Sequence, residues 1–371
     1  MKKTFVCSTD QFIVGGAESY TIRMMEWNKQ NGNRNVLILF KGQRIAAKWR
    51  EVLAQNDVEI YYIRPEAFSV PADGRGNKLR FNRDEQVTWI AYNVYSYINA
   101  YKMSLYYCEV KIHPKLYALH PFTLKKRCNT KVEQKLFDRF FYRIHNKNVW
   151  FMDDEIKSYN ESIYGVLFQN PIIPIGMDLK EDIHIEEKDE KKCRILTVAR
   201  LDFPIKGYVT GLIKDFEMLH KEYPDTTLTI VGDGPGRVKL ENIINRLDED
   251  TRKSIELAGS VDYRELGKYY DNCDLYLGQG TTLLEASLRG KIAIVQLSYQ
   301  YTTISSGFFH SRPMFIGGEL NNYSGKRYTA LELMRQAMGY TREERKEYGE
   351  TARKAVWDNY DITKTMKILM D

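Results

Sequence analysis

The feature of this 371-residue chain that most restricts its fold is a unit found in both halves: a short apolar run, a turn rich in glycine or basic residues, and a helix. In the first half, "KTFVCST" (3–9) leads through "VGGAES" (14–19) into a helical segment that stops before Gly32, and "NVLILF" (35–40) follows. A strand, turn, helix and strand in this order predict a parallel crossover unit.

The second half repeats this unit. Its apolar runs lie in "CRILTVAR" (193–200), "TTLTIVGDGPG" (226–236) and "DLYLGQGTTLLEASLRGKIAIVQL" (274–297). We therefore predict two doubly wound α/β domains, the number that the usual domain size favours for this length. Sheets of this kind bind ligands beyond the carboxyl ends of their strands, and the glycine-rich and basic turns all lie there.

The charge pattern predicts where the two domains are joined. Residues 178–192 hold seven acids against four bases and few large apolar side chains, which is typical of a solvated connection. We expect four segments: an N-terminal domain over 1–175, an acidic linker over 176–192, a C-terminal domain over 193–345, and a helix over 346–371 that packs back on the N-terminal domain.

Composition favours a cytoplasmic protein without a membrane-spanning segment. No apolar run approaches the roughly 18 residues that a membrane helix needs, and the apolar run after the basic start is too short for a secretion signal. The five cysteines are scattered, odd in number and free of C-x-x-C spacing, which favours reduced thiols over a zinc site or a disulfide framework. The acids of "LDEDT" (247–251) follow a helix rather than a strand, so we expect a solvated helix end there and no metal site.

A long helix with a basic row is predicted over 129–147, inside a region (101–150) that holds eleven Lys or Arg against three acids. Four basic residues recur every fourth position, and apolar residues lie between them: Lys131, Lys135, Arg139 and Arg143, with Val132, Leu136, Phe140, Phe141 and Ile144. The helix is either an ordinary amphipathic helix with a solvated basic face or a surface that binds anionic headgroups. Nucleic acid is a weaker option because no recognition module accompanies the charge.

Two strand-end turns predict a site for a phosphate-bearing ligand. In "ARLDFPIKG" (199–207), Arg200 closes an apolar strand and Lys206 follows six residues later; two such cations suit a diphosphate, although a solvated loop is the alternative. Gly15 and Gly16 precede a helix N-terminus, where backbone amides can approach a phosphate or a sugar. For the glycines of "VGDGPGR" (231–237), a structural turn is favoured over a dinucleotide fingerprint.

Two further side chains each have a structural and a functional interpretation. The segments "SLYYCEV" (104–110) and "KLYALH" (115–120) are predicted strands. His120 ends the second strand, and His113 lies nearby in the sequence. A lone histidine is more often structural than catalytic. Glu285 follows Thr282 by three residues, which predicts a capping box, or else its carboxylate and the free amides of the turn face a ligand.

Taken in order, "GGAE", "ARLDFPIKG", "VGDGPG" and "GTTLLEASLRG" resemble the GT-B family of retaining glycosyltransferases often called family 4, and the resemblance covers nearly the whole chain. It implies two doubly wound Rossmann-like domains that face each other across a cleft. It also implies a nucleotide-sugar donor, a glycan, lipid-linked or polysaccharide acceptor, retention of the anomeric configuration, and no metal or other cofactor. We expect a cytoplasmic enzyme of cell-envelope polysaccharide biosynthesis, peripheral at the inner face of the membrane.

The resemblance also implies roles for individual residues. Arg200 and Lys206 would hold the diphosphate with the backbone amides of Thr281, Thr282 and Leu283, and Gly280 would also bind the donor. Glu285 would accept hydrogen bonds from the ribose. Gly15 and Gly16 would close over the donor, and His120 would lie near the transferred sugar.

The chain departs from the family pattern at two places. Leu277 stands where family members often carry another acid, eight residues before Glu285, and the basic loop is about one residue longer than usual. We expect the amides of Gly280 and Thr281 to replace the missing acid. The departure leaves room for a GT-B-shaped partner subunit or chaperone of another glycosyltransferase, although the retained cations and Glu285 favour an enzyme. A sugar-nucleotide epimerase of the same shape is a weaker alternative.

Overall fold

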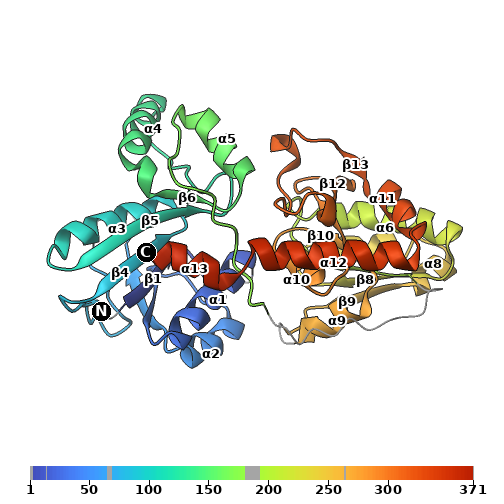
Figure 1. Ribbon diagram of the computed structural model, residues 1–371, viewed down its shortest axis with the longest axis horizontal. Helices are drawn as coiled ribbons and strands as arrows, with labels where there is room; N and C mark the ends of the chain where they lie inside the picture. The colour runs from blue at the N-terminus through green and yellow to red at the C-terminus, as the bar shows by residue number, and fades with distance from the viewer. Residues whose placement is uncertain (1–2, 14, 65–68, 180–192, 263–264, 371) are drawn as a thin grey trace. The chain divides into compact units, whose positions relative to one another are not determined.

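The computed structural model describes residues 3–13, 15–64, 69–179, 193–262 and 265–370. The chain divides into two compact units (Figure 1). The N-terminal unit comprises residues 1–178 and 360–371, and the C-terminal unit comprises residues 179–359. Most of the expected acidic linker, residues 180–192, lies outside the described residues.

In the described residues, the N-terminal unit is built on a six-stranded parallel sheet with the order β3-β2-β1-β4-β5-β6. This is the strand order of a doubly wound Rossmann-like sheet, whose order reverses between β1 and β4. The strands are β1 (Lys3–Thr9), β2 (Arg34–Phe40), β3 (Glu59–Ile63), β4 (Gln86–Ala91), β5 (Lys111–Ala118) and β6 (Val149–Phe151). The helices are α1 (Gly16–Gln30), α2 (Ala47–Gln55), α3 (Val94–Tyr106), α4 (Lys131–His145), α5 (Asp154–Tyr164) and α13 (Ile362–Met370).

The predicted strand over 104–110 is wrong. Helix α3 continues to Tyr106, and β5 begins only at Lys111. The reason is that Val94, Tyr97 and Ala100 recur three residues apart and are fully buried against the sheet, and Met103 continues the row, so the tertiary structure prolongs the helix into the apolar run.

The predicted basic helix is confirmed as α4. A capping box fixes its start, because the Thr130 hydroxyl accepts from the Glu133 amide (3.1 Å) and the Glu133 carboxylate accepts from the Thr130 amide (3.0 Å). Tyr142 is its only buried residue within the described chain. Helices α4 and α5 lie side by side beyond β6 at one edge of the unit (Figure 1).

The C-terminal unit has a second doubly wound sheet, with the order β13-β12-β11-β10-β7-β8-β9 in the described residues. Five strands are parallel: β7 (Cys193–Val198), β8 (Thr226–Val231), β9 (Ile255–Gly259), β10 (Leu275–Gly278) and β11 (Ile292–Gln296). The antiparallel pair β12 (Ile304–Phe308) and β13 (Tyr328–Thr329) completes the sheet. Its helices are α6 (Tyr208–Glu222), α7 (Arg237–Ile244), α8 (Glu249–Lys253), α9 (Leu266–Asn272), α10 (Thr281–Leu288), α11 (Ala330–Met338) and α12 (Arg342–Asn359). Within "LDEDT", Asp248 caps α8 by accepting from the Thr251 amide (2.9 Å).

The predicted single helix over 346–371 is wrong, because the chain forms two helices there. Helix α12 belongs to the C-terminal unit and contacts α10, whereas α13 belongs to the N-terminal unit and contacts α1. Met177 causes the break: its amide donates to the Tyr360 carbonyl (2.5 Å), and its carbonyl accepts from the Ile362 amide (3.0 Å). This short parallel bridge removes the backbone groups that a continuous helix would use. The indole of Trp27 on α1 donates to the Thr363 hydroxyl (3.2 Å) and so ties α13 down.

None of the helices in the described ranges combines the length and the apolar character that crossing a membrane requires.

Candidate functional site

The two predicted cations lie on one loop at the carboxyl end of β7, between β7 and α6. The Arg200 side chain is 42% exposed, and its guanidinium lies 3.0 Å from the Asp202 carboxylate. Exposed ion pairs of this kind contribute at most about 1 kcal/mol. Arg200 can therefore exchange Asp202 for an anionic ligand at small cost.

Lys206 is in a different electrostatic state from Arg200. It is only partly exposed, and its amide donates to the Asp202 carbonyl (2.9 Å). Burial, with the charge of Arg200, lowers the pKa of Lys206 to about 7, and no carboxylate in the described chain offsets these two effects. The loop thus holds an ammonium that no carboxylate of the described residues offsets, and this arrangement favours an anion-binding site.

The glycines of "VGDGPGR" hold this basic loop in place. A Cβ at Gly232 would collide with the Ala199 carbonyl, and one at Gly234 would lie 2.7 Å from the Leu201 carbonyl. The two loops can therefore approach backbone to backbone, with Ala199 and Leu201 donating to the carbonyls of Val231 and Asp233 (both 2.9 Å). The structural interpretation of these glycines is supported, and their contribution to the site is indirect.

The predicted capping box at Thr282 is wrong. Gly280 has φ +70°, a conformation that favours glycine, and it is the N-cap of α10, which therefore begins at Thr281, two residues earlier than a Thr282 cap would require. The Thr282 hydroxyl instead donates to the Gln279 carbonyl (3.1 Å) and accepts from the Tyr276 hydroxyl (2.7 Å). It also lies 3.5 Å from the Val198 carbonyl. The start of α10 is thereby joined to the strand that carries the basic loop.

Only some of the four backbone amides expected to bind the donor are available. The Gly280 amide donates to the Ile316 carbonyl (2.6 Å), and the Leu283 amide donates to the Gly280 carbonyl (3.1 Å). The amides of Thr281 and Thr282 have no acceptor in the described chain. These two N–H groups, at the positive end of a helix, can receive an anion.

Glu285 lies one turn into α10, and its carboxylate pairs with Arg289, four residues later, at 3.3 Å. Both side chains are 17% exposed, and Arg289 also contacts Asp271 (3.0 Å). No sequence motif pointed to Arg289, although the spacing of Glu285 and Arg289 is the one at which helical side chains of opposite charge meet. The pairing holds a carboxylate with two acceptor oxygens, which suits the two hydroxyls of a vicinal diol.

Leu277, which replaces the family's acid, is fully buried on β10 in the core of the C-terminal unit. The Gly280 amide cannot replace that acid, because it is already bonded to Ile316. Of the two substitutes expected from the sequence, the Thr281 amide is the one that remains available.

The N-terminal residues of the predicted site follow the carboxyl ends of their own sheet. Gly15 precedes the first residue of α1, Gly16, and a Cβ at Gly15 would lie 2.6 Å from the Glu18 carboxylate. His120 is exposed in a turn after β5, and its Nδ1 accepts from the Phe122 amide (3.2 Å), which leaves the proton of a neutral ring on Nε2. His113, in contrast, lies within β5 itself.

Helix α4 has a basic row and an apolar row, both on its outer side. The basic row consists of Lys131, Lys135, Arg139 and Arg143, all exposed. The apolar row consists of Val132, Leu136, Phe140 and Ile144, with exposed fractions between 51% and 67%. Phe141, which the sequence groups with these apolar residues, instead stacks on Phe137 (4.6 Å between ring centroids) on the side that packs against the unit.

Within the described ranges, no three His, Cys, Asp or Glu side chains come together in a way that could hold a metal ion.

The part of the chain that carries this site matches a known family. Residues 178–303 match the family model described as glycosyl transferases group 1. A stretch of 120 residues, 31% of this chain, is 31% identical to the GtfA subunit of a UDP-N-acetylglucosamine–peptide N-acetylglucosaminyltransferase of Streptococcus parasanguinis. A stretch of 74 residues, 20% of this chain, is 34% identical to the alpha-monoglucosyldiacylglycerol synthase of Acholeplasma laidlawii. These matches span 22% and 18% of the length of the two relatives.

The fold extends the similarity over the whole chain. The crystal structure of a glycosyltransferase from Rickettsia africae superposes with a TM-score of 0.66 at 14% identity, covering 99% of this chain and 96% of that chain. At this identity the likeness speaks for the fold alone, which is of the GT-B class.

Proposed function

We propose that this protein is a glycosyltransferase, because residues 178–303 match the family model of the glycosyl transferases group 1 and the chain has the GT-B fold. It moves a sugar from a nucleoside-diphosphate sugar to a hydroxyl group of a glycan, lipid-linked or polysaccharide acceptor. Retention of the anomeric configuration belongs to the proposal because the sequence motifs resemble those of the retaining family.

The observation that carries the proposal is that Arg200 and Lys206 lie on one loop at the carboxyl end of β7, where burial and the charge of Arg200 lower the pKa of Lys206 to about 7. A protein gains nothing in stability from a partly buried cation that no carboxylate of the described residues offsets, so its presence on a strand-end loop favours a functional role. A diphosphate brings two negative groups to this loop. Arg200 binds them as a planar fork and Lys206 as a point charge.

The same groups account for the chemistry. When the bond between the anomeric carbon and the phosphate oxygen breaks, the electron pair stays on the diphosphate. Lys206, Arg200 and the amides of Thr281 and Thr282 stabilise this developing charge, so the proposal needs no metal or other cofactor. Glu285 accepts hydrogen bonds from the ribose hydroxyls. The roles that the family resemblance implies for His120, Gly15 and Gly16 of the N-terminal unit stay predictions.

The acceptor is proposed to lie at a membrane, with the protein peripheral at its cytoplasmic face. Helix α4 supports membrane binding, because its exposed apolar row can enter the apolar interior of a membrane while its basic row contacts the anionic headgroups. One relative is named for making a glycolipid, alpha-monoglucosyldiacylglycerol, which agrees with a lipid acceptor.

A second candidate is a GT-B-shaped partner subunit of another glycosyltransferase. The name of the other relative, a GtfA subunit, favours it, and so does the loss of the acid at Leu277. Arg200 and Lys206 on one strand-end loop argue against it, because a scaffold has no use for a diphosphate site.

A screen of nucleoside diphosphates and their sugars tests the enzyme against the partner subunit. We expect one nucleotide class to raise the melting temperature, since a ligand at a hundred times its Kd stabilises by about 2.7 kcal/mol. We also expect slow hydrolysis of the matching nucleotide sugar without acceptor. A chain that neither binds nor hydrolyses any nucleotide sugar is the partner subunit.

Glu285→Gln is expected to lower donor turnover at least about tenfold, which corresponds to 1.4 kcal/mol, because the amide accepts weaker hydrogen bonds from the ribose than the carboxylate does. Its melting temperature should change little, because Glu285 does not cap α10 and its pair with Arg289 is of the kind worth about 0.5 kcal/mol or less. Hydrolysis rates and thermal melts measure the two effects.

The matched control is Glu217→Gln on α6, which breaks a similar pair with Lys221 (2.7 Å) away from the basic loop. The control should leave turnover unchanged. If Glu285→Gln melts much earlier while turnover is kept, the role of Glu285 is structural.

A further inference from the structure

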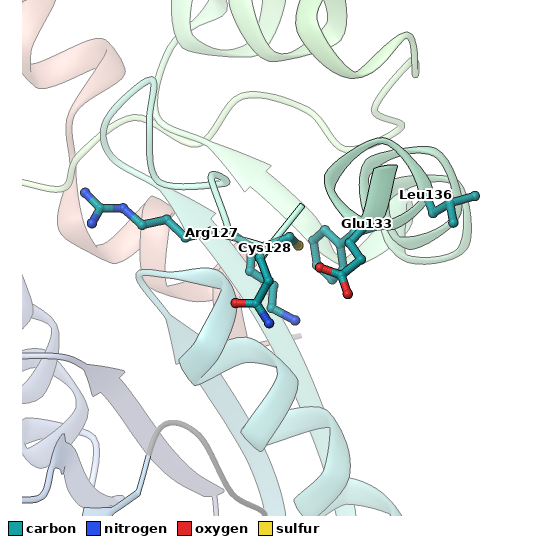
Figure 2. A pocket seen from close by; sticks show the side chains of 7 residues that line it. Arg127, Cys128, Glu133 and Leu136 are labelled. Atoms are coloured by element: carbon teal, nitrogen blue, oxygen red, sulfur yellow. The ribbon is translucent and has the colours of Figure 1, made fainter. Parts of the chain in front are cut away.

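A pocket of about 490 Å³ lies in the N-terminal unit, between helix α4 and the segment that precedes it. Figure 2 shows Arg127 and Cys128 on that segment, and Glu133 and Leu136 on the helix. Lys126, Asn129 and Phe137 complete its lining. None of these residues belongs to the proposed donor site.

The polarity of the pocket changes from one end to the other. Arg127 and Leu136 lie at opposite ends of it in Figure 2. The ammonium of Lys126 lies 4.6 Å from the centroid of the Phe137 ring, a cation–π contact that holds a positive charge at the wall. The acid of the pocket, Glu133, already accepts from the Thr130 amide (3.0 Å). With two cations, Lys126 and Arg127, against this one acid, the net charge of the lining is positive.

The apolar end of the pocket continues into the apolar row of α4. Leu136 belongs to both: it lines the pocket and is 51% exposed. Beyond it, Phe140 (55%) and Ile144 (64%) extend the row along the helix, with Arg139 and Arg143 beside them. A ligand in the pocket with a charged head would thus have apolar surface at its other end.

We propose that this pocket binds the phosphate-bearing headgroup of a single anionic membrane lipid, whose acyl chains lie along the apolar row. The proposal rests on the membrane part of the proposed function and is independent of sugar transfer. Charge complementarity favours this occupant, because Lys126 and Arg127 line the pocket and Lys131, in the basic row of α4, is exposed. An apolar row without these cations would suit a protein partner equally well.

Cys128 gives a direct readout, because it lines the pocket and is a free, partly buried thiol. Cys108, a free and exposed thiol of the same unit, serves as the internal reference. The probe is dihexanoylphosphatidylglycerol below its micelle concentration, so that no bilayer covers the surface. We expect saturating probe to slow alkylation of Cys128 on the order of tenfold relative to Cys108, since thiol reactivity depends on access.

Two charge reversals and two other solutes define the outcomes. Arg127→Glu, at the wall, should abolish protection of Cys128, whereas Lys125→Glu, an exposed neighbour outside the lining, should keep it. Dihexanoylphosphatidylcholine and inorganic phosphate should protect weakly, which separates an anionic lipid from a zwitterionic lipid and from free phosphate. Equal protection by either solute overturns the proposal.

Vesicle binding separates this proposal from the proposed membrane association. If the soluble lipid leaves Cys128 fully reactive while the protein still sediments with anionic vesicles, the pocket proposal is wrong and the proposed membrane association is retained. If the protein does not sediment with such vesicles and Cys128 is unprotected, both fail, and a protein partner becomes the occupant of the apolar row.

Discussion

Replacing Lys206 by methionine is expected to lower the affinity for the nucleoside diphosphate by about 10- to 150-fold, the 1.5–3 kcal/mol of a charge-assisted hydrogen bond. At the same time, the unliganded protein should become more stable. Methionine keeps most of the aliphatic length of lysine but removes a buried ammonium that no carboxylate of the described chain offsets. Such a group costs at least about 1 kcal/mol.

The gain in stability should depend on pH. The pKa of Lys206 is about 7 in the folded protein, against 10.5 for an ordinary lysine. Below pH 7 the side chain is charged in both states, so the folded wild type carries the whole penalty. The penalty falls as the pH rises from 7 towards 10.5, because the folded state loses its proton while the unfolded state keeps it. The variant's advantage is therefore expected to be largest at pH 6 and to shrink above pH 7.

Nucleotide binding should depend on pH in the opposite sense to stability. A bound diphosphate favours the charged lysine, so above pH 7 the wild type must take up a proton on binding and its affinity declines. Calorimetry and thermal melts between pH 6 and 9 measure both effects. Lys214→Met, the same change at an exposed position of α6, serves as the control and should alter neither. Unchanged nucleotide affinity in Lys206→Met rejects the diphosphate site.

Replacing all four residues of the apolar row of α4 by serine is expected to weaken binding to anionic vesicles by up to about a thousandfold. Each half-exposed side chain contributes about 1 kcal/mol when it enters the bilayer, part of the roughly 1.5–3 kcal/mol of full burial. The fold should be retained, because Val132, Leu136, Phe140 and Ile144 are all more than half exposed. Vesicle sedimentation at rising salt measures the remaining electrostatic part, which screening reduces.

Serine at Met218 and Val238, two exposed apolar positions of the C-terminal unit, provides the comparison. These changes should leave vesicle binding as it is in the wild type. If the fourfold variant binds anionic vesicles as tightly as the wild type, the apolar row does not enter the membrane.

The sequence by itself determined the elements whose signals are local. Apolar runs ended by glycine or basic turns predicted both doubly wound sheets, and the strand-end rule placed Arg200 and Lys206 on one loop. It also predicted α4, because the basic residues that recur every fourth position all lie within the helix. In each case the residues that decide the structure are neighbours in the chain.

Tertiary structure determined the local conformation at those positions where contacts with distant residues compete with a local preference. Met177 breaks the C-terminal helix by pairing with Tyr360 and Ile362, residues almost two hundred positions away. Burial of α3 against its sheet overrode the strand signal of 104–110. The rotation of α4 about its axis, which buries Tyr142 and leaves Phe140 outside, depends on which face meets the unit.

The charge states and ion pairs of the candidate site also depend on tertiary structure more than on local sequence. The sequence shows that a lysine follows an arginine by six residues, but it does not show how much water reaches the ammonium. The structure buries Lys206 without an offsetting carboxylate among the described residues, and it turns Glu285 from a cap into the partner of Arg289. Desolvation and ion pairing depend on every atom nearby in space, and those atoms come from strands and loops that are far apart in the chain.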